Sequence, residues 1–317
     1  WFGLFIEIEK ISKLYGFKMQ INFMKPRKIA SVLSIIMILI SLGSLTFRGL
    51  DLGLDFTGGT LIEIQLSKPT DLEQIRDVLG LKLDDDFQVS YFGSEQDVLI
   101  KIPGGSENNL SDEIVSSLNE SFKFDLRRKD FIGPQIGEEL RDQGGLGLLA
   151  ALLVMMAYIM FRFQFKFAIG ALLALVHDVV IVLGIFSVFY IGFNLTVLAA
   201  LLAVIGYSLN DTIVVSDRIR ENYRKKRKSD NIDVINRSLN QMLGRTLITS
   251  LTTLLVLFAL LILGGDFIQN FAIALICGVI VGTYSSIYVL CNNLILMNLN
   301  FEDLAIKKSE QFEDGMP

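Results

Sequence analysis

The residue best placed to do chemistry is Asp211, an aspartate inside the apolar segment LLAVIGYSLNDTIVVSDRIREN. A carboxylate near the middle of a membrane helix costs roughly 2.5–3.5 kcal/mol on insertion scales, so it needs a reason to be there. Such acids usually mark an ion or proton path, and a plain interhelical hydrogen bond is the alternative. Helical spacing puts Tyr207 and Ser208 on the face of Asp211. Asn210 and Thr212 are expected to bond neighbouring helices instead.

Arg245 is the predicted partner of this aspartate. It opens a later apolar run and shares a helix face with Thr249 and Thr252. An arginine at the cytoplasmic end of a span also satisfies the positive-inside rule without any further role. Asp211 lies about seven residues, or ~10 Å, from the end of its span, a depth that a snorkelling arginine can reach. A paired arginine favours the charged carboxylate, so arrival of a proton would break the pair.

His177 and Asp178 are a second polar pair within an apolar stretch. Adjacent helix positions point about 100° apart, so the two cannot serve one partner equally. We count both among the candidate proton-path residues, and a proton relay and an interhelical hydrogen bond remain open for them. The chain has one histidine, so no metal site is predicted. No cofactor is expected either.

The elements that position these residues are membrane spans. Hydrophobic residues make up 51% of the 317 residues, and the mean hydropathy is +0.50. A span needs about 20 apolar residues, and counting such runs predicts six transmembrane helices. The chain is predicted to begin with a cytoplasmic N-terminal segment, 1–28, and a first span, 29–47, which acts as an uncleaved anchor. An extracytoplasmic domain, 48–143, follows. Spans 2–6 lie in 144–301 and include a basic loop, 217–245, and the chain ends in a cytoplasmic tail, 302–317. Lys and Arg concentrate in segments that fall on one face, which places both termini in the cytoplasm.

Residues 48–143 are predicted to form a ferredoxin-like α+β domain. Strand and helix patterns alternate in the order β-α-β-β-α-β, with TLIEIQL, FQVSYFG, DVLIKIP and KFDLRRKDFI as strands. The segment has neither His nor Cys, and its acids, including the DDD run at 84–86, resemble a solvated surface. We therefore expect a module that docks or binds polypeptide, with no catalytic site.

Glycines mark two further kinds of feature. GLDFTGG (53–59) and GPQIGEEL (133–140) read as tight reversals where spans meet the domain, and the first lacks the Lys and Ser/Thr of a phosphate loop. Their motif residues are Asp55, Gly58, Gly59, Gly133 and Pro134. In the last span Gly278, Gly282 and Ser286 recur every four residues, a stripe that lets helix backbones approach closely.

These motifs resemble those of the SecF family. GLDFTGG, GPQIGEEL, HDVVIVLGIFS, GYSLNDTIVVSDRIREN, RTLITSLTTLLVLFALLILGG and GVIVGTYSSIYV carry the resemblance, which runs from about residue 21 to residue 300. SecF is the smaller half of the bacterial SecDF export factor, a relative of the resistance-nodulation-division transporters. The resemblance implies six spans in the cytoplasmic membrane, pairing with SecD, and proton-driven assistance to the SecYEG channel as it exports preproteins. It also implies proton conduction at Asp211 and Arg245.

Three alternatives to this function are open. A proton-coupled small-molecule antiporter of the same superfamily would share the buried acid, but it would need a larger outer domain with a drug-sized pocket. An intramembrane hydrolase would need H-E-x-x-H or G-x-S-x-G, which the chain lacks. A scaffold for SecD would tolerate loss of the Asp211 carboxylate. No enzymatic activity and no nucleic-acid partner are expected.

Overall fold

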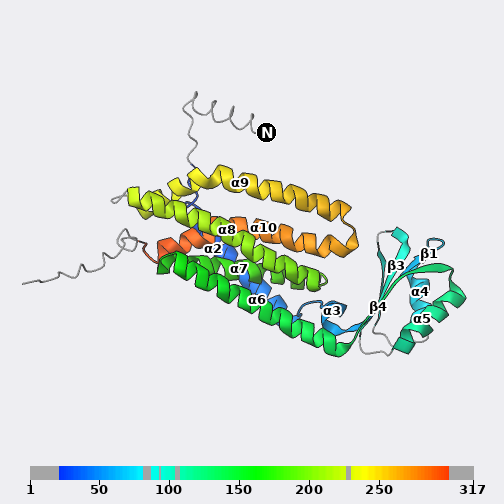
Figure 1. Ribbon diagram of the computed structural model, residues 1–317. Helices are drawn as coiled ribbons and strands as arrows, with labels where there is room; N and C mark the ends of the chain where they lie inside the picture. Colours follow the sequence, from blue (N-terminus) through cyan, green and yellow to red (C-terminus); the bar gives the residue numbers. More distant parts are fainter. Residues whose placement is uncertain (1–20, 81–86, 93, 104–107, 226–229, 300–317) are drawn as a thin grey trace, which may run out of the picture.

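The computed structural model describes residues 21–80, 87–92, 94–103, 108–225 and 230–299 (Figure 1). The DDD run and the two terminal segments lie outside these residues, apart from residues 21–28. The elements are α2 (Arg27–Phe47), α3 (Leu54–Thr57), β1 (Gly59–Leu66), α4 (Leu72–Gly80), β2 (Gln88–Phe92), β3 (Ser94–Pro103), α5 (Asn108–Ser121), β4 (Phe124–Ile132), α6 (Pro134–Arg162), α7 (Phe165–Phe189), α8 (Leu195–Lys225), α9 (Asn231–Leu263) and α10 (Asp266–Leu296).

Six of the described helices, α2 and α6–α10, are long and apolar enough to cross a membrane, as predicted. They form a bundle with the α+β domain at one end, which we call the domain end. The connection between α8 and α9 lies at the opposite end, which we call the loop end (Figure 1). The helices α6, α8 and α9 extend well beyond the apolar runs that predicted them. Polar residues at their ends therefore continue the helices past the spans.

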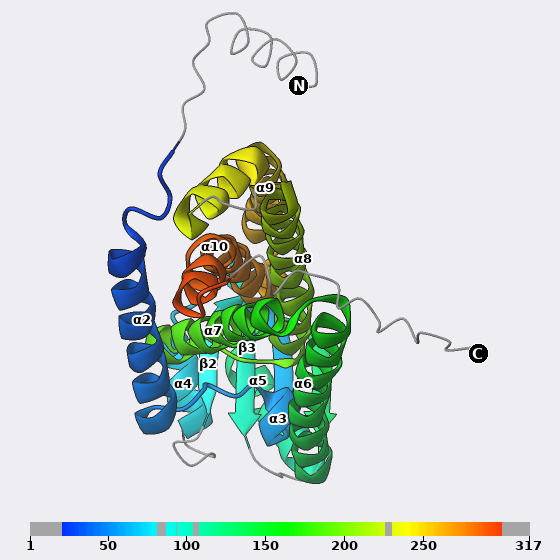
Figure 2. The same cartoon turned by 90° about the vertical axis from the view of Figure 1, so that its left-hand side faces the viewer.

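Helix α10 lies inside the bundle, and Figure 2 shows it with α2, α7, α8 and α9 around it. Helix α7 is also largely enclosed, whereas α2, α6 and α9 leave most of their apolar side chains exposed. Exposed apolar faces on long helices fit a bilayer, where lipid tails are the solvent. The chain is a multi-pass membrane protein.

The domain holds a four-stranded antiparallel sheet in the order β2-β3-β1-β4. Alternate residues of the central strands, such as Ile62 and Ile100, are fully buried against α4 and α5. These helices cover the face turned away from the bundle (Figure 1). The β-α-β-β-α-β order matches the prediction. The other face of the sheet looks toward the domain end of the bundle.

The two glycine motifs pack against each other where the domain joins the bundle. Gly58 and Gly59 follow the short helix α3 with φ of 69° and 139°, a region that favours glycine. A Cβ on Gly58 would lie 2.7 Å from the Cα of Pro134, which opens α6 after Gly133. Asp55 accepts a hydrogen bond at 3.0 Å from the backbone N–H of Leu195, the first residue of α8. The motifs therefore fix how three helices meet the sheet.

Candidate functional site

Polar side chains run along the contact between α8 and α9, which lie antiparallel. Toward the domain end, the Tyr207 hydroxyl of α8 donates to Ser250 Oγ of α9 at 3.3 Å. Ser250 is 6% exposed and its hydroxyl also bonds Thr283 Oγ1 of α10 at 2.8 Å. The hydrogen bonds that join three helices here come from hydroxyl groups.

Toward the loop end the same contact is made by amides and a guanidinium. Gln241 Oε1 of α9 accepts from Arg218 Nε at 2.7 Å and from Asn222 Nδ2 at 2.9 Å, both on α8. Asn222 Nδ2 also donates to Ser238 Oγ at 2.8 Å. Arg218 is further held by Glu221 at 2.6 Å. These groups tie α8 and α9 together beyond the apolar run.

Asp211 and Arg245 lie between these two bonded levels. Asp211 follows Tyr207 by four residues and precedes Arg218 by seven, and Arg245 follows Gln241 by four. Antiparallel packing therefore brings the two to one level, and their charges interact electrostatically. No ion pair of 4.0 Å or less joins these two described side chains. The expected partners face each other without a direct bond.

The carboxylate itself is buried and unsatisfied. Asp211 is 5% exposed, and its Oδ2 atom has no hydrogen-bond partner among the described residues. Buried polar atoms nearly always have partners, so an orphaned carboxylate oxygen indicates a functional group or a bound solvent molecule. Arg245 is exposed at the surface of α9. A buried acid beside a movable cation can exchange a proton, since either protonation or approach of the arginine satisfies it.

The other buried aspartate is fully satisfied. Asp178 Oδ1 lies 2.8 Å from His177 Nδ1, and its Oδ2 accepts from the hydroxyls of Ser208 on α8 and Ser285 on α10. His177 Nε2 lies 3.2 Å from Ser34 Oγ on α2. Ser34 in turn bonds the hydroxyl of Tyr284, which donates to the Ala30 carbonyl at 2.7 Å. The network joins α2, α7, α8 and α10.

This bonding bears on two expectations. His177 and Asp178 bond different residues of the neighbouring helices, as the 100° separation of their positions requires. They also bond each other. Ser208, expected on the helix face of Asp211, does not bond it, because the Ser208 hydroxyl donates to Asp178. Of the two roles left open for the pair, the saturated bonding favours the interhelical one.

The glycines of α10 meet α8 at close range, as predicted. A Cβ on Gly278 would lie 2.1 Å from Val204 Cγ2, and one on Gly282 would lie 3.0 Å from Ser208 Cβ. Each separation is below an ordinary carbon contact. The close approach brings Ser285 of α10 within reach of Asp178.

Four other predicted polar residues lie apart from this network. Asn210 is exposed on the outer surface of α8, and Thr212 is buried, and neither side chain makes a hydrogen bond within the described residues. Their expected role in bonding neighbouring helices stays a prediction. Thr249 and Thr252 donate to carbonyl groups of α9 itself. They stabilise their own helix and do not reach Asp211.

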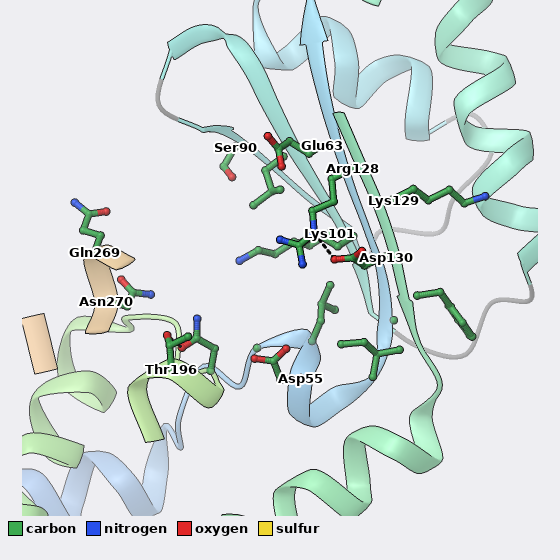
Figure 3. Close-up of a pocket in the computed structure, with 18 of the residues that line it drawn as sticks. Asp55, Glu63, Ser90, Lys101, Arg128, Lys129, Asp130, Thr196, Gln269 and Asn270 are labelled. Atoms are coloured by element: carbon green, nitrogen blue, oxygen red, sulfur yellow. Dashed lines mark hydrogen bonds and ion pairs between the residues drawn. The ribbon is translucent and has the colours of Figure 1, made fainter. Parts of the chain in front are cut away.

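A cleft of about 850 Å³ lies between the open face of the sheet and the domain end of the bundle (Figure 3). Sheet residues with acidic and basic side chains line one wall, and amide side chains from the starts of α8 and α10 line the other. The labelled wall residues include Glu63, Lys101, Arg128, Asp130, Thr196, Gln269 and Asn270. Charges of both signs alternate on the sheet, so the cleft has no dominant sign.

Asp51 lies near this cleft, between α2 and α3. Its backbone carbonyl accepts from Phe193 N–H at 2.7 Å, which pins the link to the turn between α7 and α8. Burial raises the pKa of the Asp51 carboxyl above its usual value, and the positive charge of Lys101 partly offsets that rise. No group of three or more His, Cys, Asp and Glu side chains able to hold a metal occurs in the described ranges.

Several bonded residues were not singled out by the sequence. Gln241 and Ser250 flank Arg245 at four and five positions, and Ser285 belongs to the quoted motif GVIVGTYSSIYV. Spacing from Arg245 could have found Gln241, four residues before it, but not Ser250. A serine or threonine in a span gives a weak signal by itself, because its hydroxyl can bond its own helix.

Two family models match this chain. One, described as protein export membrane protein SecD/SecF, C-terminal, covers residues 113–300, and the other, the SecD/SecF GG motif, covers residues 43–70. The second match spans the GLDFTGG turn, and the first spans Asp211, Arg245, His177 and Asp178. The GLDFTGG turn and the level of Asp211 and Arg245 therefore both lie in matched segments.

Similar proteins are known by sequence and by structure. The protein translocase subunit SecF of Pseudomonas aeruginosa is 48% identical over 300 residues, covering 94% of this chain and 98% of that protein. SecF of Vibrio alginolyticus is 45% identical, covering 94% and 97%. The crystal structure of SecDF from Thermus thermophilus superposes with a TM-score of 0.82 at 34% identity and covers 92% of this chain. The present chain spans 41% of that SecDF chain.

Proposed function

Because the chain belongs to the SecF family of protein-export membrane proteins, we propose that it uses proton movement at Asp211 to assist export of preproteins through SecYEG, together with SecD. The coarser role, that of a SecF protein-export subunit, follows from family membership. The proposal adds the energy source, the partners and the residues that carry the proton. It also places both termini in the cytoplasm and the α+β domain outside the membrane.

The observation that carries the proposal is the unpartnered carboxylate oxygen of Asp211. Hydrogen bonds tie α8 to α9 on either side of this level, at Tyr207 and Ser250 and again at Arg218 and Gln241. Only the level of Asp211 and Arg245 is left without a bond among these described contacts. A charge state that changes there would alter the attraction between two helices that are otherwise held together.

The energy available is adequate for such a switch. A proton that crosses ~150–200 mV releases roughly 3.5–4.6 kcal/mol. Moving a two-state equilibrium from 1:99 to 99:1 takes about 5.5 kcal/mol. One or two protons per cycle are therefore enough to shift α9 against α8. Movement of the bundle would reach the domain through α3 and α6, whose glycine motifs pack closely.

Exposed polar residues support a second helical bundle as partner. Gly206 and Asn210 are exposed on α8, and Arg245 is exposed on the adjacent helix α9. An asparagine and an arginine facing lipid would leave polar groups without partners. A SecD-like bundle seated on this face would cover them and enclose Asp211. A smooth contact around Gly206 would also allow close helix packing.

The test is proton flux and preprotein export in vesicles that contain this chain with its SecD partner. Asp211→Asn should abolish proton-dependent export and proton flux, because the amide cannot bind and release a proton. Asp178→Asn, the other buried aspartate, is the matched control and should retain flux in the protein that assembles. Undiminished flux and export in Asp211→Asn would overturn the proposal and favour a scaffold role.

A further inference from the structure

A chain of three hydroxyl groups lies between Asp211 and the domain end of the bundle. Tyr207 is one helical turn from Asp211 on α8, a rise of ~6 Å. Its hydroxyl donates to Ser250, and Ser250 bonds Thr283. The hydroxyls come from α8, α9 and α10 and form an unbroken series.

The protons in this series can be counted. Tyr207 donates its hydroxyl proton to Ser250 Oγ, so the proton of Ser250 is available for Thr283 Oγ1. Each hydroxyl both donates and accepts, so each can take one proton and release its own. The series therefore can pass a proton without a change in composition or oxidation state.

The loop-end side of Asp211 has a different chemistry. The Arg218 guanidinium has donors but no acceptor, and the amides of Gln241 and Asn222 do not pass a proton on as a hydroxyl does. These groups also bond one another, although Gln241 is exposed. The two approaches to Asp211 along α8 and α9 are thus unequal.

We propose that Tyr207, Ser250 and Thr283 are a proton relay that serves Asp211 from the domain end. This inference rests on the proposed function and deepens it by naming the route. In the bonding shown, Tyr207 donates to Ser250, so the hydroxyls must first turn about their C–O bonds to reverse the direction of donation. A proton taken up by Thr283 then displaces the Thr283 proton to Ser250, that of Ser250 passes to Tyr207, and that of Tyr207 passes through water to the Asp211 carboxylate. One proton enters and one is bound, so the sequence of transfers is balanced.

An apolar cluster closes the outer end of this relay. Leu257, Ile276 and Val279 are buried next to Tyr207, with three partly buried leucines packed around them. Water does not enter an apolar contact of this kind without displacement of side chains. The relay is therefore sealed from the domain end in this conformation, and proton entry requires α9 and α10 to separate there.

Hydroxyl bonds between helices could also serve only to hold the helices together, and the two roles predict different results. If the role is structural, proton flux depends on packing and not on the hydroxyl groups themselves. A relay needs a hydroxyl at each position. Thr283 allows a direct comparison. Thr283→Ser keeps the hydroxyl and removes a methyl group, while Thr283→Val keeps the shape and removes the hydroxyl.

The experiment measures proton flux in vesicles that contain this chain and its SecD partner, with assembly and thermal stability measured on the same samples. Ser250→Ala and Thr283→Val should lower flux on the order of tenfold or more, since proton transfer by a positioned side chain contributes at least that much. Thr283→Ser should restore it. Thr252→Val is the control, because its hydroxyl bonds only its own helix.

The outcomes distinguish failure of the relay from failure of the proposed function. Wild-type flux in Ser250→Ala and Thr283→Val, with Asp211→Asn blocked, would overturn the relay and leave the proposed function standing. Equal loss in Thr283→Ser and Thr283→Val would also overturn the relay, because packing would then be the cause. Flux that survives in Asp211→Asn would overturn the proposed function and the relay with it.

Discussion

Replacing Gly278 with alanine tests how closely α10 must approach α8. The added Cβ would lie 2.1 Å from Val204 Cγ2 and 2.7 Å from Cγ1. Carbon atoms in contact prefer about 3.5–4.0 Å, so the overlap amounts to about 1.5 Å. Val204 is 1% exposed and β-branched, which leaves it little freedom to rotate within a helix. The two helices must therefore move apart.

The free energy change combines two opposing effects. Overpacking of a core costs about 1–3 kcal/mol. Replacing a helical glycine by alanine returns about 0.8–1.0 kcal/mol through helix propensity. Because the overlap at Gly278 is severe, we expect the variant to lose about 2 kcal/mol of stability. Displacement of α10 would also pull Ser285 away from Asp178 and weaken that network.

The assay is denaturation of the purified protein in detergent, with Gly206→Ala as the control. Gly206 lies on α8, two residues after Val204, and a Cβ there would meet nothing within 4 Å. This control gains the propensity term without the overlap, so its difference from Gly278→Ala isolates the steric cost. Adding Val204→Ala to Gly278→Ala removes the clashing methyl groups and should recover part of the loss, with a coupling of about 1–3 kcal/mol.

Equal stability of Gly278→Ala and Gly206→Ala would refute this account of the packing. Strict additivity in the double variant would refute it as well, since Val204 would then not be the obstacle. Either result would mean that α8 and α10 do not approach as closely as the glycine stripe allows.

Three further predictions concern other contacts. Asp178→Asn should lower stability by about 1–3 kcal/mol, because a carboxylate that accepts three hydrogen bonds is lost, and thermal unfolding would measure this. Asn240→Ala should raise hydrogen exchange at Ile21, whose N–H and carbonyl both bond the Asn240 amide. Asp51→Asn should raise the free energy of unfolding slightly near pH 8, by no more than about 1 kcal/mol, and the difference should vanish in acid.

The sign of the Asp51 prediction follows from its raised pKa. A carboxyl whose folded pKa exceeds its unfolded value of 3.8 favours the folded state while protonated, and this contribution is lost as pH rises through the folded pKa. The side-chain amide of the Asp51→Asn variant stays neutral at every pH, so this variant does not lose stability as the pH rises. Stability that is equal at pH 8, or a difference that grows in acid, would contradict the reasoning. For the other two, Asp77→Asn and Asn210→Ala at exposed sites are controls.

The sequence predicted the helices and strands more completely than it predicted the contacts between side chains. Hydropathy found the six spans, because a helix in lipid needs about 20 apolar residues whatever its neighbours are. The strand alternation in TLIEIQL found β1, because its buried face repeats every second residue. The ends of α6, α8 and α9 were missed, since polar residues continue a helix outside the bilayer without an apolar signal.

By itself, the sequence determined that Asp211 lies in a span, that Arg245 opens the next one and that small residues line α10. Tertiary structure alone decided that Ser208 bonds Asp178 and that Ser250 bonds both Tyr207 and Thr283. It also decided that Asp211 Oδ2 has no hydrogen-bond partner among the described residues. The physical reason is that a helix touches several neighbours. Spacing along one helix gives the face of a residue, but the rotation and approach of the other helices select its partner.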